Sequence, residues 1–228
     1  MLIEYVKEDY FSQVEFLYTL SSEDNEKREL LTNLIIIDVV TNMEVYVERL
    51  LNQFLKKYNE VGVPSSKVDD KLKIEHTKKI MSTLEKLITH DHKQDDTISI
   101  LKGISDLWGN DSEEIVPIDV ATKFPRGKHG EVHLESLFAK MNICNVLDKV
   151  AIDNQTESLL DDSKLDIAEF IGDITSKRNL AIHEGVPLHF RVSLENLRFV
   201  IDTTNDLLFQ LTGLVNDELN RYRQLLAS

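Results

Sequence analysis

The sequence is poor in the residues that interrupt helices or cross-link small domains. Its 228 residues include one cysteine, four prolines and eight glycines. The single cysteine, Cys144, excludes an internal disulfide and a zinc site built from several thiolates, and its apolar neighbours predict a core position. Scarce proline and glycine favour long, uninterrupted helices.

Long apolar runs and a targeting segment are also lacking. The run Leu34-Ile35-Ile36-Ile37 stops at Asp38, far short of the roughly 20 residues that a membrane-spanning helix needs. The first five residues contain no basic stretch followed by an apolar one, so no secretory signal is expected. We therefore expect a soluble protein of the cytoplasm that does not contact a membrane.

Basic residues are outnumbered by acidic ones. The chain has 26 Lys and Arg against 40 Asp and Glu, a formal net charge of −14. A surface broadly coated for nucleic acid is therefore unexpected, because phosphate binding depends on Lys and Arg. A small cationic cleft in an acidic body stays compatible with this charge, since overall acidity suppresses indiscriminate binding.

Apolar residues recur at three- and four-residue steps through most of the chain, as amphipathic helices require. In the second expected helix they include Ile36, Val40, Met43 and Val47. The predicted helices span residues 3–20, 23–60, 67–89, 95–108, 131–141, 143–151, 163–183 and 194–225. We predict an all-α fold, a helical bundle in which residues 1–228 form a single domain.

Residues 109–130 have no clean period and form the one long loop that we expect. A structureless stretch of this length is unusual in a compact domain and is often functional. It gathers positive charge at Lys123, Arg126 and Lys128. Two interpretations of its charge stay open: the loop contacts an RNA backbone, or it is a solvated, flexible connection. A boundary between two subdomains at this loop is the alternative to a single domain.

Two pairs of histidines have a spacing that metal sites use. His129 and His133 lie four residues apart, but Gly130 disrupts the helix that both would need to share. His90 and His92 flank Asp91 at an expected helix break, where a turn explains them better. We predict no metal site.

The residues with the clearest chemical potential stand at the end of the expected 163–183 helix, in the segment Arg178-Asn179-Leu180-Ala181-Ile182-His183. On an ideal α-helix Arg178 and His183 differ by roughly 140° and rise by about 7.5 Å, so a tightened or frayed last turn would help them meet. Asn179 shares a face with His183 and is placed to orient its imidazole. By spacing alone, ordinary residues favoured at a helix C-terminus are the simpler explanation of this pattern.

This segment resembles the motif of the HEPN family, in which an Arg is followed by four to six residues and a His, and Asn often follows the Arg. The expected bundle, with the motif late in the chain at the end of the penultimate long helix, is similar to HEPN domains. The stretch Asn42-Met43-Glu44-Val45-Tyr46-Val47-Glu48 also resembles the family's helix that packs near the motif.

The resemblance implies a metal-independent, cofactor-free endoribonuclease. Arg178, Asn179 and His183 would be its catalytic residues, in a homodimer whose two motifs line one cleft. RNA would supply the 2′-hydroxyl as nucleophile, and the imidazoles would act as base and acid. Glu44 and Glu48 would support the motif, although Glu44 is equally explained as an exposed edge residue, and Lys177 would add an RNA contact beside Lys123, Arg126 and Lys128.

The same resemblance implies a toxin of a toxin–antitoxin or phage-defence system, held in check by an inhibitor or antitoxin protein. A catalytically inactive helical scaffold or protein-interaction module is the alternative. A third interpretation is a small ligand-binding module that uses Arg178 for a phosphate. No glycine-rich phosphate loop, Gly-x-Ser-x-Gly or His-Glu-x-x-His sequence points to other chemistry.

Overall fold

The computed structural model describes residues 2–24, 26–88, 94–109, 113–125, 129–152, 165–184, 188 and 192–227. Within these residues every regular element is helical, which confirms the predicted all-α bundle. The elements are α1 (Glu8–Glu23), α2 (Arg28–Val61), η1 (Ser65–Lys67), α3 (Asp70–Ile88), α4 (Gln94–Trp108), α5 (Glu131–Lys140), α6 (Val146–Lys149), α7 (Ile167–Asn179), η3 (Leu180–Glu184) and α8 (Leu194–Ala227).

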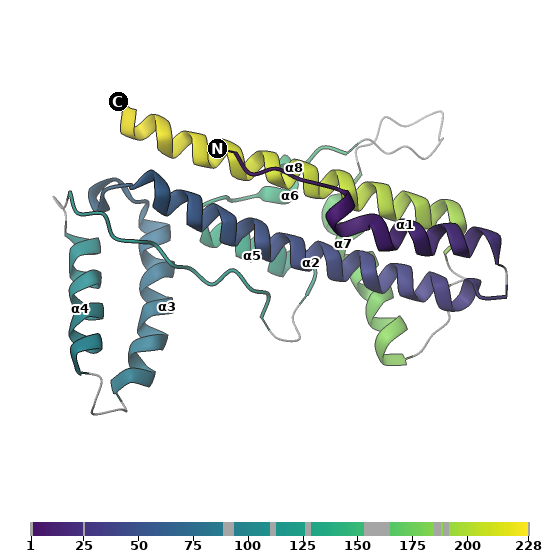
Figure 1. Ribbon diagram of the computed structural model, residues 1–228, viewed down its shortest axis with the longest axis horizontal. Coiled ribbons are helices and arrows are strands. Elements are labelled where there is room, and N and C mark those ends of the chain that lie inside the picture. Colours follow the sequence, from purple (N-terminus) through teal and green to yellow (C-terminus); the bar gives the residue numbers. More distant parts are fainter. Residues whose placement is uncertain are drawn as a thin grey trace.

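Two long helices, α2 and α8, form the axis of the bundle (Figure 1). Each buries apolar residues at three- and four-residue steps, which gives one continuous stripe along its length. In α2 this stripe includes Ile36, Met43 and Phe54, all almost fully buried. The buried apolar residues join in one cluster that runs from Ile3 to Tyr222, so the two helices are the main scaffold of the core.

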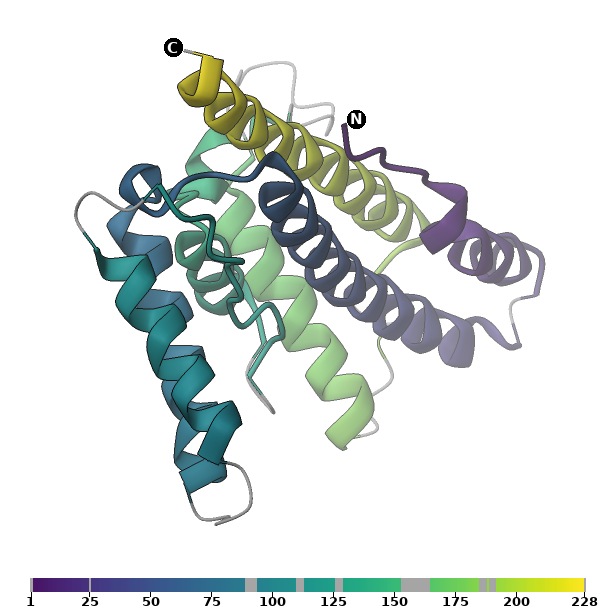
Figure 2. The same ribbon diagram turned by 60° about the vertical axis from the view of Figure 1, so that its left-hand side comes forward.

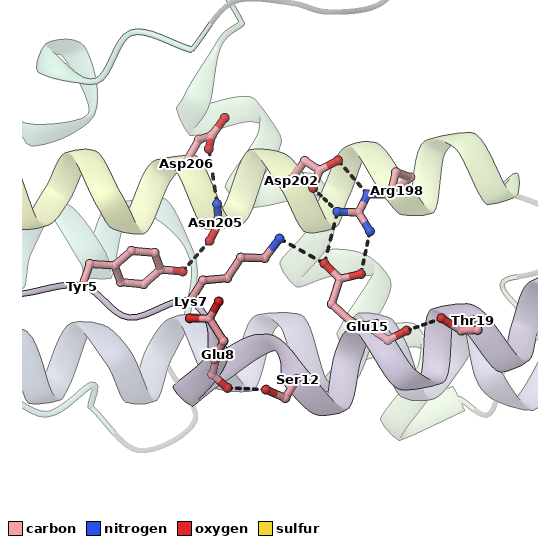
Figure 3. Close-up of polar contacts among 10 residues, drawn as sticks. All are labelled: Tyr5, Lys7, Glu8, Ser12, Glu15, Thr19, Arg198, Asp202, Asn205 and Asp206. Atoms are coloured by element: carbon pink, nitrogen blue, oxygen red, sulfur yellow. Dashed lines mark hydrogen bonds and ion pairs between the residues drawn. The ribbon is translucent and has the colours of Figure 1, made fainter.

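Helix α1 lies along α2 and α8, and charged side chains join α1 to α8 (Figure 3). Arg198 of α8 donates to both carboxylate oxygens of Glu15, at 2.6 and 3.1 Å. Its Nε also donates to Asp202 at 2.7 Å, and Lys7 reaches Glu15 at 3.0 Å. The bidentate geometry and the shared acceptors fix the angle at which α1 meets α8.

Helices α3 and α4 pack against each other and project from one end of the bundle (Figures 1 and 2). Leu72 and Leu107 join the common core. Farther along the hairpin, Ile98 and Leu101 are exposed. The hairpin is therefore anchored at its base and carries apolar side chains to solvent at its far end.

Three extended segments are held by carboxamide side chains of the long helices. Asn59 of α2 accepts from the backbone N–H of Ile118 at 2.8 Å and donates to its carbonyl at 2.9 Å. Asn216 holds Ile3 in the same way, and Gln210 holds Ala151. Each amide thus replaces the partner strand that an extended residue would otherwise need.

The predicted long loop is present between α4 and α5, and much of it is bound to α2 rather than loosely solvated. We call residues 113–125 the strap. Besides the Asn59 contact, Thr122 donates to Asn52 at 3.1 Å and the N–H of Phe124 donates to Glu48 at 2.9 Å. Ile118 and Val120 are buried. The strap therefore runs along α2 (Figure 2).

Several helix ends differ from the predicted ones. The expected helix 143–151 is only α6, because Asn142 and Asn145 adopt left-handed backbone conformations at φ 64° and 53°, which α-helices exclude. Cys144 lies in this irregular stretch and is exposed, so its predicted core position is wrong. The predicted turn at His90 to His92 lies outside the described residues.

Among the described helices, α2 alone is long and apolar enough to cross a membrane, with a mean hydropathy of 1.5 over its best window. Half of that window is buried inside the bundle. The central helix of a helical core has the same composition, so this property is weak evidence for a membrane span.

Replacement of Asn59 by alanine tests the strap. We expect Asn59→Ala to lower the free energy of unfolding by about 1–3 kcal/mol, because it leaves a buried N–H and C=O without partners. Asn52→Ala is the matched control. That side chain is exposed and its oxygen accepts one bond from a hydroxyl, so its loss should stay below about 1 kcal/mol. Equal losses in urea unfolding would contradict this account of the strap.

Candidate functional site

The Arg–His segment spans the junction between α7 and a turn of π-helix. Asp166 caps α7 by accepting from the N–H of Glu169 at 3.0 Å. Ile167, Phe170, Ile171 and Ile174 then bury one face of the helix. After Asn179 the backbone widens into η3. The last turn is therefore wider than an α-helical turn, and π-turns of this kind are frequent at functional sites.

Arg178 and His183 meet different surroundings at this junction. The imidazole of His183 is exposed. The side chain of Arg178 is only 14% exposed and turns towards α2. In a π-turn each hydrogen bond joins residues that are five apart in sequence. Arg178 and His183 are also five apart.

Two acceptors surround the guanidinium of Arg178. Nη1 donates to the side-chain oxygen of Asn179 at 3.1 Å, and Nη2 lies 3.8 Å from Oε2 of Glu44. Asn179 thus contacts Arg178, and among the described residues it makes no hydrogen bond to His183. The predicted role of Asn179 in orienting the imidazole has no contact to support it in this structure.

Glu44 is partly buried, contrary to the interpretation that placed it at an exposed edge. Its side chain is 13% exposed, and Oε1 lies 2.7 Å from Nδ1 of His129, an ion pair when the imidazole is protonated. Burial raises the pKa of the Glu44 carboxyl, and the nearby His129 and Arg178 oppose that rise. At this distance the imidazole and the carboxylate pair directly with each other.

Buried side-chain atoms without a hydrogen bond of regular geometry concentrate around this carboxylate. In the part of the chain that the structure describes, there are five such nitrogen or oxygen atoms. Four belong to one neighbourhood: Glu44 Oε1 and His129 Nδ1, which form the 2.7 Å ion pair, and Thr175 Oγ1 and Arg178 Nε. Thr175 lies one turn before Arg178, and its side chain comes within 4 Å of the place where a Cβ on Gly130 would stand. Buried polar atoms without a partner are rare in folded proteins, and a catalytic role or a bound water or ion can explain them.

The other predicted residues have different roles or places. Glu48 accepts from the N–H of Phe124 and so holds the strap. Lys123 is exposed on the strap. Lys177 forms an ion pair with Asp173 one turn earlier on α7. Arg126 and Lys128 lie outside the described residues.

The sequence does not assign two residues of this cluster to the site. It brings out His129 only as half of a metal-like pair with His133, and it gives no reason to consider Thr175. His129 and Thr175 come together because the chain after the strap turns back towards α7, and this contact joins residues far apart in the sequence. The one local sign of it in the sequence is Gly130, whose φ of 91° lets the chain approach Thr175 closely.

No group of three His, Cys, Asp or Glu side chains gathers as metal ligands would in the described ranges. His129 faces Glu44 rather than His133. We assign no metal or cofactor to these residues.

Comparison of the chain with models of protein families, with curated proteins and with solved structures found no match. The likeness to the HEPN family therefore depends on the Arg178–His183 segment and on its place at a helix end.

The contact between Glu44 and Arg178 is testable by a double-mutant cycle. Glu44→Gln and Arg178→Met should each destabilise the fold, because each leaves a mostly buried charge without its counter-charge. The double variant should lose less than the sum of the two, with a coupling of about 0.5–3 kcal/mol in urea unfolding. Additive losses would show that the two side chains do not interact.

Proposed function

We propose that this protein is a metal-independent endoribonuclease whose catalytic residues are Arg178 and His183, with Asn179 in support. The observation that carries the proposal is the end of α7, where an exposed imidazole and a guanidinium follow each other across a π-turn. Arg178 Nε makes no hydrogen bond within the described part of the chain. Both groups suit a phosphodiester.

The chemistry needs no group beyond the RNA and these side chains. An imidazole takes the proton of the 2′-hydroxyl as the 2′-oxygen bonds to phosphorus. The bond to the 5′-oxygen breaks, and a second imidazole gives that oxygen a proton. Arg178 stabilises the negative charge that builds on the phosphoryl oxygens. The products are a 2′,3′-cyclic phosphate and a 5′-hydroxyl.

Two imidazoles are required, and one chain supplies one at this place. We propose that a second copy supplies the other, in a homodimer whose two motifs share a cleft. His183 is exposed, as a residue facing a second copy across a cleft must be in an isolated chain. An inhibitor or antitoxin protein, and a role as a toxin in the cytoplasm, follow from the HEPN likeness alone.

A scaffold without catalytic activity is the second candidate, and one observation favours it. The guanidinium of Arg178 faces the carboxylate of Glu44 and is 14% exposed, so a phosphate has to compete with that carboxylate. A scaffold would use the same dimer surface and leave RNA intact.

Cleavage in EDTA decides between the two. We expect the purified protein to cut RNA in the presence of EDTA and to leave 2′,3′-cyclic phosphate ends. His183→Ala and Arg178→Ala should each lower the rate by about 100-fold or more. His133→Ala is the matched control, because this half-buried histidine of α5 lies outside the cluster, and it should cut at the parental rate.

The substrate offers a second control. A single 2′-deoxy nucleotide at the cleaved position should block cutting there, because it removes the nucleophile. Cleavage that survives this change, or that survives in both the His183 and the Arg178 variants, would refute the mechanism. Intact RNA with the parental protein would favour the scaffold.

A further inference from the structure

The position of His129 is fixed by contacts that the chain on either side of it makes with neighbouring helices. Glu48 and Glu44 stand one turn apart on α2, and each contacts the chain between α4 and α5. Glu48 accepts from Phe124, the residue before the end of the strap. Five residues further on, the imidazole of His129 meets Glu44.

The chain is held again directly after His129. Gly130 has a left-handed φ of 91° and lies against Thr175 of α7. Its carbonyl then accepts from the N–H of Leu134 and starts α5. His129 is therefore held between the strap on one side and the first turn of α5 on the other.

Three side chains from three parts of the fold converge as a result. Glu44 comes from α2, Arg178 from α7 and His129 from the turn before α5. Their side chains are 13%, 14% and 24% exposed. The carboxylate lies in the middle, with one oxygen towards the imidazole and the other towards the guanidinium.

We propose that His129 is a positioning residue of this site: it fixes the carboxylate of Glu44, which in turn fixes the guanidinium of Arg178 at the end of α7. The inference rests on the proposed ribonuclease function for its catalytic consequence. His129 does not touch the substrate. Its effect passes through Glu44.

The charged groups around Glu44 also link its protonation to His129. Burial raises the pKa of the carboxyl, and Glu48 on the same helix raises it further. His129 and Arg178 lower it. Loss of His129 therefore moves the pKa of Glu44 upwards, and the carboxylate protonates at a higher pH. A protonated Glu44 holds a guanidinium less strongly.

The cluster also holds two buried polar atoms without a hydrogen bond within the described residues, Thr175 Oγ1 and Arg178 Nε. Buried ionic groups are often replaced by apolar ones without loss of stability. Stability of the fold alone therefore does not explain why Glu44, His129 and Arg178 meet here. The positioning of the Arg178 guanidinium does explain it.

RNA cleavage by His129→Leu tests the proposal. We expect kcat to fall by about 10- to 100-fold with little change in KM, because a misplaced guanidinium stabilises the transition state less. The acid limb of the pH–rate profile should move to higher pH. His129→Gln should recover part of the activity, since its amide can still donate to Glu44. The control His133→Leu should match the parent in rate and profile.

A readout that needs no activity separates this proposal from the proposed function. The Nη2–H signal of Arg178 in ¹⁵N NMR, identified by its loss in Arg178→Lys, reports how firmly Glu44 holds the guanidinium, because Nη2 is the nitrogen that faces its carboxylate. Its exchange with water should be about tenfold faster in His129→Leu than in the parent and in His133→Leu.

Unchanged exchange in His129→Leu would overturn the positioning role, whatever the cleavage rates. An unmoved acid limb in a His129→Leu variant that still cleaves would do the same. Faster exchange in His129→Leu, together with a parental protein that cuts no RNA, would keep the positioning role and refute the ribonuclease.

Discussion

The guanidinium of Arg178 is a permanent positive charge that is mostly withdrawn from water, and the site is arranged around that constraint. A buried charge needs a counter-charge, and Glu44 of α2 supplies it. Glu44 is itself partly buried and lies against His129. His129 keeps its place because Glu48 and the amide of Asn59 hold the strap along α2. The guanidinium of Arg178 is thus connected, through Glu44 and His129, to α2 and to the chain before α5.

The π-turn after α7 separates the two groups that we propose as catalytic. Arg178 stands on the regular helix, where Asn179 and Glu44 hold its guanidinium, whereas His183 stands on the turn and its imidazole makes no hydrogen bond within the described residues. In the proposed reaction the guanidinium stays in place to stabilise charge, and the imidazole has to move a proton. A rigid group and an accessible group at one helix end suit that division of roles.

Periodicity predicted the helices well because their burial is local. The predicted helix 194–225 corresponds to α8 (Leu194–Ala227), and the predicted 95–108 to α4 (Gln94–Trp108). The Arg–His segment was equally visible, since its residues are nearly consecutive. The strap and the burial of Glu44 were not, because they depend on polar side chains of α2 that pair with residues more than 50 positions away. The left-handed Asn142 and Asn145 likewise shorten a helix for reasons of backbone conformation that apolar spacing does not show.

The most direct measurement is a crystal structure of the protein with a short RNA that carries a 2′-O-methyl group at the cleavage position and so cannot react. The account predicts one phosphate within hydrogen-bonding distance of the guanidinium of Arg178. It also predicts that imidazoles of His183 from two copies flank the 2′-oxygen and the 5′-oxygen. RNA bound elsewhere on the molecule, with Arg178 still facing Glu44 and His183 in solvent, would contradict it.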